Sequence, residues 1–347
     1  MPFQVLSSPH DHPARPVNRL MLQVLLALIP AIAIITWFFG FGLLINLTLA
    51  SATALLAEAA VLRLRRRPVR PALFDLSALV SAWLLAIAVP TILPWWMVVL
   101  GSLFAIVVVK QLYGGLGYNP FNPAMAGYLL LLISYPMEMT QRLSPSIPRE
   151  HMPDLLQSLH ISFLRVIPPG TTWDALTGAT PLDELRTKLA MGLRVDQIHS
   201  GSFWGHLTGQ PWEWVSLALF ISGLWLIYRR VISWHIPLAF LGSLSALAFL
   251  FFLLDPQRYP VGFFHLVSGG TMLGAFFIAT DPVTASTTPL GRLIYAAAIG
   301  VIVFAIRSWG GYPDAVAFAV VLMNMAVPMI DHYTQPRVTG HKRRLGP

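Results

Sequence analysis

Long apolar segments separated by shorter polar ones fill most of the chain between residues 20 and 330. A helix needs about 20 apolar residues to cross the hydrocarbon core of a bilayer, and ten segments reach or approach that length. They are residues 20–39, 41–62, 73–93, 95–112, 123–135, 212–228, 236–254, 261–280, 293–306 and 314–330, of which the fifth and the ninth are short. The pattern predicts an all-α polytopic membrane protein with about ten transmembrane helices.

One polar interval is far longer than the other connections between these segments. It separates two groups of five apolar segments, so the sequence predicts two transmembrane halves joined by a long loop. The expected parts are an N-terminal segment at 1–19, a first transmembrane half at 20–135, the long loop at 136–211, a second transmembrane half at 212–333 and a basic tail at 334–347.

Composition supports the membrane class and limits the chemistry. Hydrophobic residues make up 56% of the chain and charged residues 11%, with a mean hydropathy of +0.66, whereas soluble domains carry about 25% charged residues. The sequence contains no cysteine. This excludes disulfides, thiolate zinc sites and cysteine-ligated iron–sulfur clusters within the chain, so any redox centre must be held in another way.

The distribution of basic residues predicts the orientation. With ten spans and a cytoplasmic N-terminus, 15 of the 23 lysines and arginines fall in cytoplasmic segments, and the short outer segments hold only Arg258 and Arg307. The long loop is expected to cross regardless of its charge and to face away from the cytoplasm. The net charge of +8 then requires no nucleic-acid partner, because residues 63–70 and similar runs face anionic lipid.

The two halves share a short pattern. Lys110 is followed by Gly114–Gly115, and Arg307 is followed by Gly310–Gly311, in segments that lie five spans apart. An odd offset places the two halves in opposite orientations, which predicts two inverted five-helix repeats, as in many transporter folds. The alternative is that the glycine pairs only end their helices.

Within the long loop, residues 174–180 read DALTGAT, the pattern D-x-x-[S/T]-G-A-T onto which flavin transferases esterify FMN. Thr180 is the candidate acceptor, and Asp174, Thr177, Gly178 and Ala179 complete the motif. Gly178 and Ala179 place little bulk beside the acceptor hydroxyl. The alternative for Asp174 is an Asx-type turn.

Thr180 also fits a purely structural role as the first residue of a helix. Pro181 follows it and Asp183 lies three residues on, which is the arrangement of a hydroxyl N-cap, a proline at the first helical position and an acid in the first turn. Capping and modification would use the same hydroxyl oxygen.

Polar residues inside the apolar segments are further candidates. Ser268, Gly269 and Gly270 lie within the eighth segment, where small residues allow close approach of the backbone to another helix or to a ligand ring. Asn119 and Asn122 lie in a stretch that interrupts two apolar segments, and non-helical backbone at membrane depth is tolerated where it lines a cavity. Both places are therefore candidates for a cavity or a second flavin. The alternatives are helix packing for the serine–glycine run and a turn for the asparagines.

Three acids lie near the ends of apolar segments. Glu58 and Asp75 are functional candidates as ionisable residues within or beside the membrane. The alternative is that they reach water or pair with Arg63 or Arg65. Asp281 is expected to form a turn.

Four motifs occur in order along the chain. They read GGLGYNPFNPAMAGY at 114–128, DALTGAT at 174–180, SGGTMLGAFFIATDPVT at 268–284 and GGYPDAVAFAVVLMNM at 310–325. With them the chain resembles, over essentially its whole length, the D subunits of Rnf-type (Rsx-type) ion-translocating oxidoreductases. It is more distantly similar to the B subunit of the sodium-pumping NADH:quinone oxidoreductase.

The resemblance implies one membrane subunit of a six-part complex in a bacterial inner membrane, with a periplasmic loop and cytoplasmic termini. Such a complex moves electrons between a ferredoxin-type carrier and NAD, coupled to sodium or proton translocation. The resemblance also implies FMN linked to Thr180 through a phosphodiester by a separate flavin transferase. Relatives bind riboflavin non-covalently as well, at a site that the motifs do not map.

Two other functions fit the apolar pattern. A ten-helix secondary transporter or channel without redox chemistry would use inverted repeats and broken helices as its substrate site. A scaffold subunit would only anchor its partners.

Overall fold

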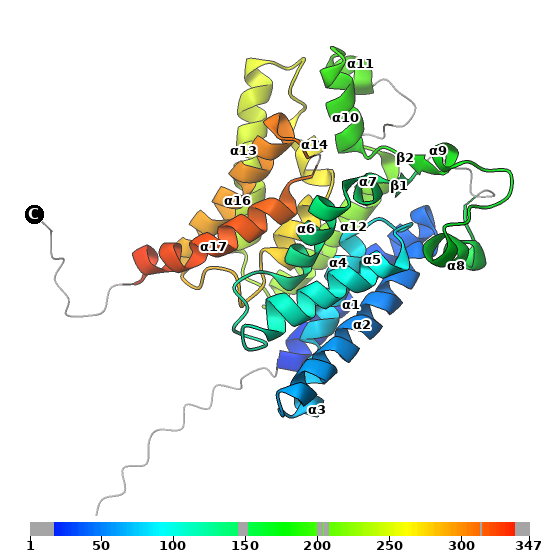
Figure 1. The fold of residues 1–347 in the computed structure, drawn as a ribbon. Helices are drawn as coiled ribbons and strands as arrows, with labels where there is room; N and C mark the ends of the chain where they lie inside the picture. Colours follow the sequence, from blue (N-terminus) through cyan, green and yellow to red (C-terminus); the bar gives the residue numbers. More distant parts are fainter. Residues whose placement is uncertain (1–16, 145–151, 200–203, 205–207, 313, 337–347) are drawn as a thin grey trace, which may run out of the picture.

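A computed structural model describes residues 17–144, 152–199, 204, 208–312 and 314–336. Most of the expected N-terminal segment and most of the basic tail therefore lie outside the described residues. The described part is almost entirely helical, with one two-stranded sheet (Figure 1).

The first half of the chain forms helices that follow the predicted apolar segments. Its elements are α1 (Val17–Phe39), α2 (Gly42–Leu64), α3 (Val69–Leu73), α4 (Ser77–Ala88), α5 (Trp95–Leu103), the π-helix η1 (Phe104–Gln111) and α6 (Pro123–Ser134). The third segment yields a shorter helix than predicted, because α4 begins after the left-handed residue Leu76 and ends before Pro90. The residue that precedes a proline is driven out of the helical region.

The long loop is folded. It contains α7 (Pro136–Thr140), β1 (Arg142–Leu143), α8 (Leu155–Leu164), α9 (Trp173–Leu176), β2 (Thr177–Gly178), α10 (Pro181–Ala190) and α11 (Val195–His199). The two strands are antiparallel, with Arg142 opposite Gly178 and Leu143 opposite Thr177.

The second half comprises α12 (Gln210–Tyr228), α13 (His235–Leu254), α14 (Gly262–Val267), α15 (Thr271–Leu273), the π-helix η3 (Gly274–Ile278), α16 (Pro289–Trp309) and α17 (Val316–Thr334). The eighth apolar segment was expected to be one helix over 261–280, but it is broken between α14 and α15. Gly269 lies in the break at a φ of +62°, a conformation that residues with a β-carbon rarely adopt.

Six of the described helices are long and apolar enough to cross a membrane. They span 17–39, 42–64, 211–228, 235–254, 289–309 and 316–334, and shorter apolar helices span 77–88, 95–111, 123–134 and 155–164. The fold is therefore that of a polytopic helical membrane protein.

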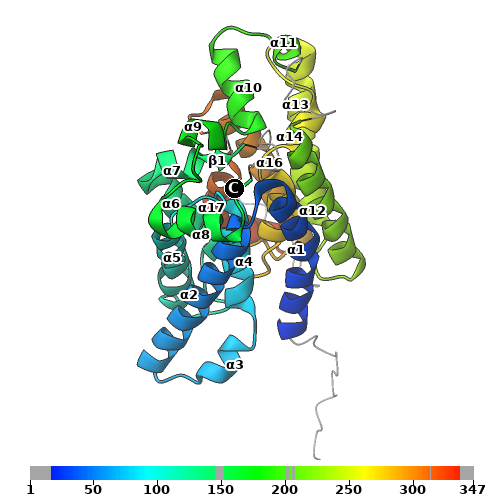
Figure 2. The ribbon, with the colours of Figure 1, turned by 90° about the vertical axis from the view of Figure 1, so that its right-hand side faces the viewer.

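The two halves pack together along α1, which lies against α12, and along α6, which lies against α17. Both views place α10 and α11 at one end of the bundle and α3 at the other (Figures 1 and 2). Many large apolar side chains on the outside are exposed, among them Leu253, Leu254 and Phe263. Exposed apolar surface of this extent is typical of helices that face lipid.

Candidate functional site

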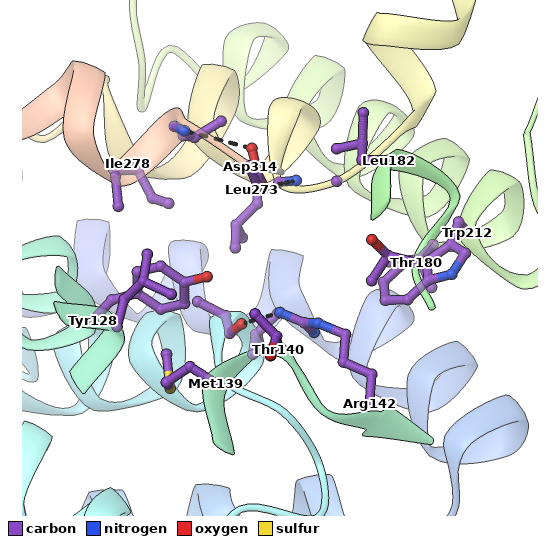
Figure 3. A pocket seen from close by; sticks show the side chains of 18 of the residues that line it. Tyr128, Met139, Thr140, Arg142, Thr180, Leu182, Trp212, Leu273, Ile278 and Asp314 are labelled. Atoms are coloured by element: carbon purple, nitrogen blue, oxygen red, sulfur yellow. Dashed lines mark hydrogen bonds between the residues drawn. The ribbon is translucent and has the colours of Figure 1, made fainter. Parts of the chain in front are cut away.

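A cavity, here called the threonine cavity, lies where the folded loop meets the bundle. Figure 3 shows Thr180, Tyr128, Arg142, Trp212 and Asp314 around it. Most of the remaining wall is apolar and comes from both halves of the chain: Ile35, Ile87, Met125, Leu132, Met139, Val215, Leu219, Leu273 and Val316. The loop and both transmembrane halves thus build one site.

Thr180 lies at the start of α10 and its hydroxyl group is part of the cavity wall. Its Oγ1 accepts a hydrogen bond from the backbone N–H of Asp183 at 3.2 Å and donates one to Oδ2 of the same residue at 2.7 Å. Pro181 occupies the first turn. The predicted N-cap is therefore confirmed, and the candidate acceptor oxygen of the motif is the capping atom.

The rest of the motif positions Thr180 rather than lining the cavity. Gly178 belongs to β2, and a β-carbon on it would lie 2.8 Å from the Cβ of Ser144, so only glycine fits there without a shift. Thr177 donates its hydroxyl to the carbonyl of Trp173 at 2.9 Å. Of the two motif threonines, only Thr180 presents its hydroxyl group to the cavity.

Asp174 and Ala179 are exposed. Asp174 lies in the first turn of α9, which is capped by Thr172 through a 3.3 Å bond from the Ala175 N–H. Asp174 therefore lies on the surface of the loop, and its role in recognition of the motif stays a prediction.

The break between α14 and α15 forms part of the cavity wall. Gly269 and Gly270 line the cavity, and the Gly270 N–H donates to Asp314 Oδ2 at 2.7 Å. Arg307 donates to Asp314 Oδ1 at 2.9 Å and to the carbonyl of Ser268 at 3.2 Å. A β-carbon on Gly269 would lie 2.7 Å from Leu182 of α10, so the break also contacts the loop.

Trp212 supplies an unused hydrogen-bond donor at the cavity. Its ring packs against Phe39 with centroids 4.9 Å apart, and the Arg142 guanidinium lies 5.7 Å from its centroid. The indole Nε1 is buried and has no hydrogen-bond partner among the described residues. Buried N–H groups nearly always have a partner, so the site is suited to a ligand or water that accepts a hydrogen bond there.

A second cavity, here called the asparagine cavity, is lined by Asn119, Asn122, Lys110 and Asp281 among others. Asn119 donates to the carbonyl of Phe121 at 3.0 Å. Asn122 caps α6 by accepting from the Met125 N–H at 3.1 Å. The two asparagines therefore form the predicted turn and also line a cavity.

The acids near the segment ends have partners. Glu58 is buried and its Oε1 accepts from Lys110 Nζ at 2.6 Å, so its partner is neither water nor Arg63 or Arg65, which were the alternatives to a functional role. The bridge joins residues 52 positions apart in the sequence. Asp75 accepts from the Ser77 N–H at 2.7 Å.

Asp281 accepts from the Val283 N–H at 3.3 Å and from the Thr284 hydroxyl at 3.0 Å, which confirms the predicted turn. Within the described part of the chain, no group of three or more histidine, cysteine or acidic side chains is arranged to hold a metal ion.

Sequence reasoning did not identify Arg142, Trp212 or Asp314 as site residues. The sequence contains a feature that could have identified Asp314, because this residue follows the second Gly–Gly pair of the repeated pattern. Arg142 and Trp212 lie at the two ends of the long loop, where polar and aromatic residues are common, and only the fold brings them beside Thr180.

The helices and cavities define a polytopic membrane protein with a loop that completes a buried site. The profile of the NQR2, RnfD, RnfE family matches residues 4–340. Relatives from Escherichia coli strains SMS-3-5, SE11 and K12, each named as the D subunit of the ion-translocating oxidoreductase complex, are 50% identical to this chain over 351 aligned residues, which cover 99% of the chain and 100% of each relative. The chain belongs to the NQR2, RnfD, RnfE family, as its motifs predict.

Proposed function

We propose that this protein is the D subunit of an ion-translocating oxidoreductase complex and carries FMN on Thr180. The observation that carries the proposal is the position of Thr180, at the end of DALTGAT and in the wall of the threonine cavity. The name of the relatives that match over their full length supports the assignment to such a complex.

The residues of the threonine cavity fit a flavin phosphate ester. A phosphate on Thr180 would lie at the N-terminus of α10, where backbone N–H groups and the helix dipole favour an anion. Arg142 adds a positive charge to the same cavity, and the unpaired Nε1 of Trp212 is a donor for a ring or ribityl oxygen. Most of the remaining wall is apolar, which suits the hydrophobic face of a flavin ring.

When bound, FMN supplies one-electron transfer between neighbouring redox centres, and the protein supplies position and electrostatics. The chain has no cysteine, so cluster-bearing centres belong to partner subunits. We therefore expect the protein to relay electrons between ferredoxin-type and NAD-linked centres within a six-part complex, coupled to sodium or proton movement. A flavin transferase and membrane lipid are its other expected partners.

A second flavin, riboflavin, is proposed for the asparagine cavity. The amide side chains of Asn119 and Asn122 lie in its wall and can donate to or accept from the polar edge of a flavin ring. Residues of η3 line both cavities, with Ile278 in the threonine cavity and Phe276 and Phe277 in the asparagine cavity, so the two sites share one helix of the bundle.

Ten spans in two inverted repeats are supported by a common feature of the two halves. Lys110 of η1 donates to Ser77 Oγ at the start of α4, at 2.7 Å. Arg307 of α16 donates to the Ser268 carbonyl at the break before α15. In each half, a basic side chain donates a hydrogen bond to a serine at the point where the preceding membrane segment is not helical. Inverted repeats predict such a correspondence.

The proposed orientation in a bacterial inner membrane has a periplasmic loop and cytoplasmic termini. The loop helices α10 and α11 lie at one end of the bundle, and α3 with the basic residues 63–70 lies at the other (Figure 2). This separation agrees with the positive-inside rule.

The test is in-gel flavin fluorescence of the denatured chain after expression with its transferase. We expect fluorescence in the native protein and in Thr177→Ser, and none in Thr180→Ala at equal expression. Fluorescence that persists in Thr180→Ala would remove the assignment. A protein without flavin that still moves a solute in liposomes would support a secondary transporter or channel instead.

A further inference from the structure

We propose that Asp183 is the general base that activates Thr180 for its own modification. This inference rests on the proposed attachment of FMN to Thr180. The two side chains are in direct contact: Thr180 Oγ1 donates its proton to Asp183 Oδ2 at 2.7 Å. Asp183 is outside the DALTGAT motif, three residues beyond its end.

The contact differs from an ordinary capping arrangement. In a capping box the side chain of the third helical residue accepts from the backbone N–H of the N-cap residue. Here the Asp183 carboxylate accepts from the N-cap hydroxyl itself, while its backbone N–H donates to the same oxygen at 3.2 Å. One bond directs the hydroxyl proton toward a carboxylate, and the other fixes the position of the oxygen.

The other charged groups near Thr180 are engaged elsewhere. Asp314 accepts from Arg307 at 2.9 Å, and Arg142 donates to the carbonyl of Ala88 at 2.9 Å. On α10 itself, Glu184 forms an ion pair with Lys188. Among the described residues, Asp183 is the acid whose carboxylate is hydrogen-bonded to the Thr180 hydroxyl.

The reaction balances with a flavin dinucleotide as the donor. An alcohol forms a phosphodiester when the phosphate carries a good leaving group, and the phosphoanhydride of a flavin dinucleotide provides one. Thr180 Oγ1 attacks the phosphorus on the flavin side, the new O–P bond forms, the bridging P–O bond breaks, and the nucleoside monophosphate leaves. The hydroxyl proton passes to Asp183 Oδ2 along the existing hydrogen bond. General-base assistance of this kind contributes about 10²- to 10⁴-fold in rate.

Proton transfer to Asp183 also removes the repulsion between its carboxylate and the phosphodiester of the product. The new phosphodiester carries a negative charge beside Asp183, and a protonated carboxyl group can donate a hydrogen bond to it. Thr180 and Asp183 both line the threonine cavity, so the attached flavin can reach that cavity from the helix start.

The experiment measures the initial rate of flavin attachment to the full-length protein in membranes, with the flavin transferase and a flavin dinucleotide. We expect Asp183→Asn, which retains an acceptor and the backbone N–H but is not a base, to slow attachment by about 100-fold or more. Asp183→Glu should recover part of the rate. The matched control is Glu184→Gln, which removes the neighbouring first-turn charge and should stay within about twofold of the native rate.

A readout that a structural role would not change is the pH dependence. The native rate should fall at acidic pH, because a general base acts only in its deprotonated form, and the rate of Asp183→Asn should fall less over the same range. A native-like rate or pH profile in Asp183→Asn would overturn the inference and leave the attachment to Thr180 intact. Absence of any adduct in the native protein would instead refute the proposed function, and this inference with it.

Discussion

The buried ion pair between Glu58 and Lys110 gives the sharpest test of how the first half is held together. Lys110 Nζ contacts Glu58 Oε1 at 2.6 Å and Ser77 Oγ at 2.7 Å, so it joins α2, η1 and the start of α4. The perturbation is Lys110→Met, which keeps the length and apolar stem of the side chain and removes the ammonium group.

The expected loss of stability in Lys110→Met follows from the burial of the ion pair. The side chains of Lys110 and Glu58 are 2% and 1% exposed, and Gln111 Nε2, at 2.7 Å, is the other donor bonded to the Glu58 carboxylate. Removing one member of a buried pair leaves an uncompensated charge and costs about 3–5 kcal/mol. Neutralising both residues in Glu58→Gln/Lys110→Met should restore most of that loss, because no charge is then left buried.

The assay is unfolding of the purified protein by SDS titration in mixed micelles, with the four proteins of a double-mutant cycle. The matched control is Lys188→Met, which breaks the Glu184–Lys188 pair on α10, where the lysine side chain is 37% exposed. An exposed pair contributes less than about 1 kcal/mol. Equal costs for Lys110→Met and Lys188→Met, or a double variant no more stable than either single one, would refute the reasoning.

Three further predictions concern topology, pH and packing. The sequence has no cysteine, so a single introduced cysteine reports its own side of the membrane. Met191→Cys, at a side chain that is 73% exposed, should react with an impermeant maleimide on intact cells, whereas Arg66→Cys should react only after permeabilisation. The reverse labelling pattern would mean that the proposed orientation is inverted. Burial lowers the pKa of His199 below 6.5 while Glu184 opposes the shift, so the folded state favours neutral imidazole. The protection of α11 against hydrogen exchange, corrected for the intrinsic pH dependence of amide exchange, should therefore fall as pH falls below about 6.5. His199→Gln should abolish that dependence. Gly223→Ala should destabilise the protein by about 1–3 kcal/mol in SDS unfolding, because its β-carbon would lie 2.3 Å from an aromatic ring of η3, whereas Gly242→Ala, with open space around it, should be nearly neutral.

The lengths of the apolar runs located the long helices well, because a membrane span is a local property of about 20 consecutive residues. The N-cap at Thr180 was also predictable, since Thr180, Pro181 and Asp183 define a helix start within four positions. The break at Ser268–Gly270 was not predicted. Its glycines were visible, but an interruption depends on what satisfies the freed backbone groups, and here Asp314 and Arg307 do so from 39 to 44 residues away.

Contacts between side chains far apart in the sequence were also not predicted. Glu58 has arginines five and seven residues away, yet its partner is Lys110, because α2 and η1 pack side by side inside the bundle. The threonine cavity shows the same limit. DALTGAT identified Thr180, while Arg142, Trp212 and Asp314 join it only through the folded loop and the two halves of the bundle.

The most direct test of the central claim is the mass of the tryptic peptide that spans residues 166–186, taken from the protein expressed with its flavin transferase. We expect this peptide, which contains both Thr177 and Thr180, to be heavier by FMN less one water. Fragment ions should place the added mass on Thr180. An unmodified peptide from protein that is fully assembled in its complex, or an adduct on Thr177, would contradict the claim that Thr180 holds the flavin.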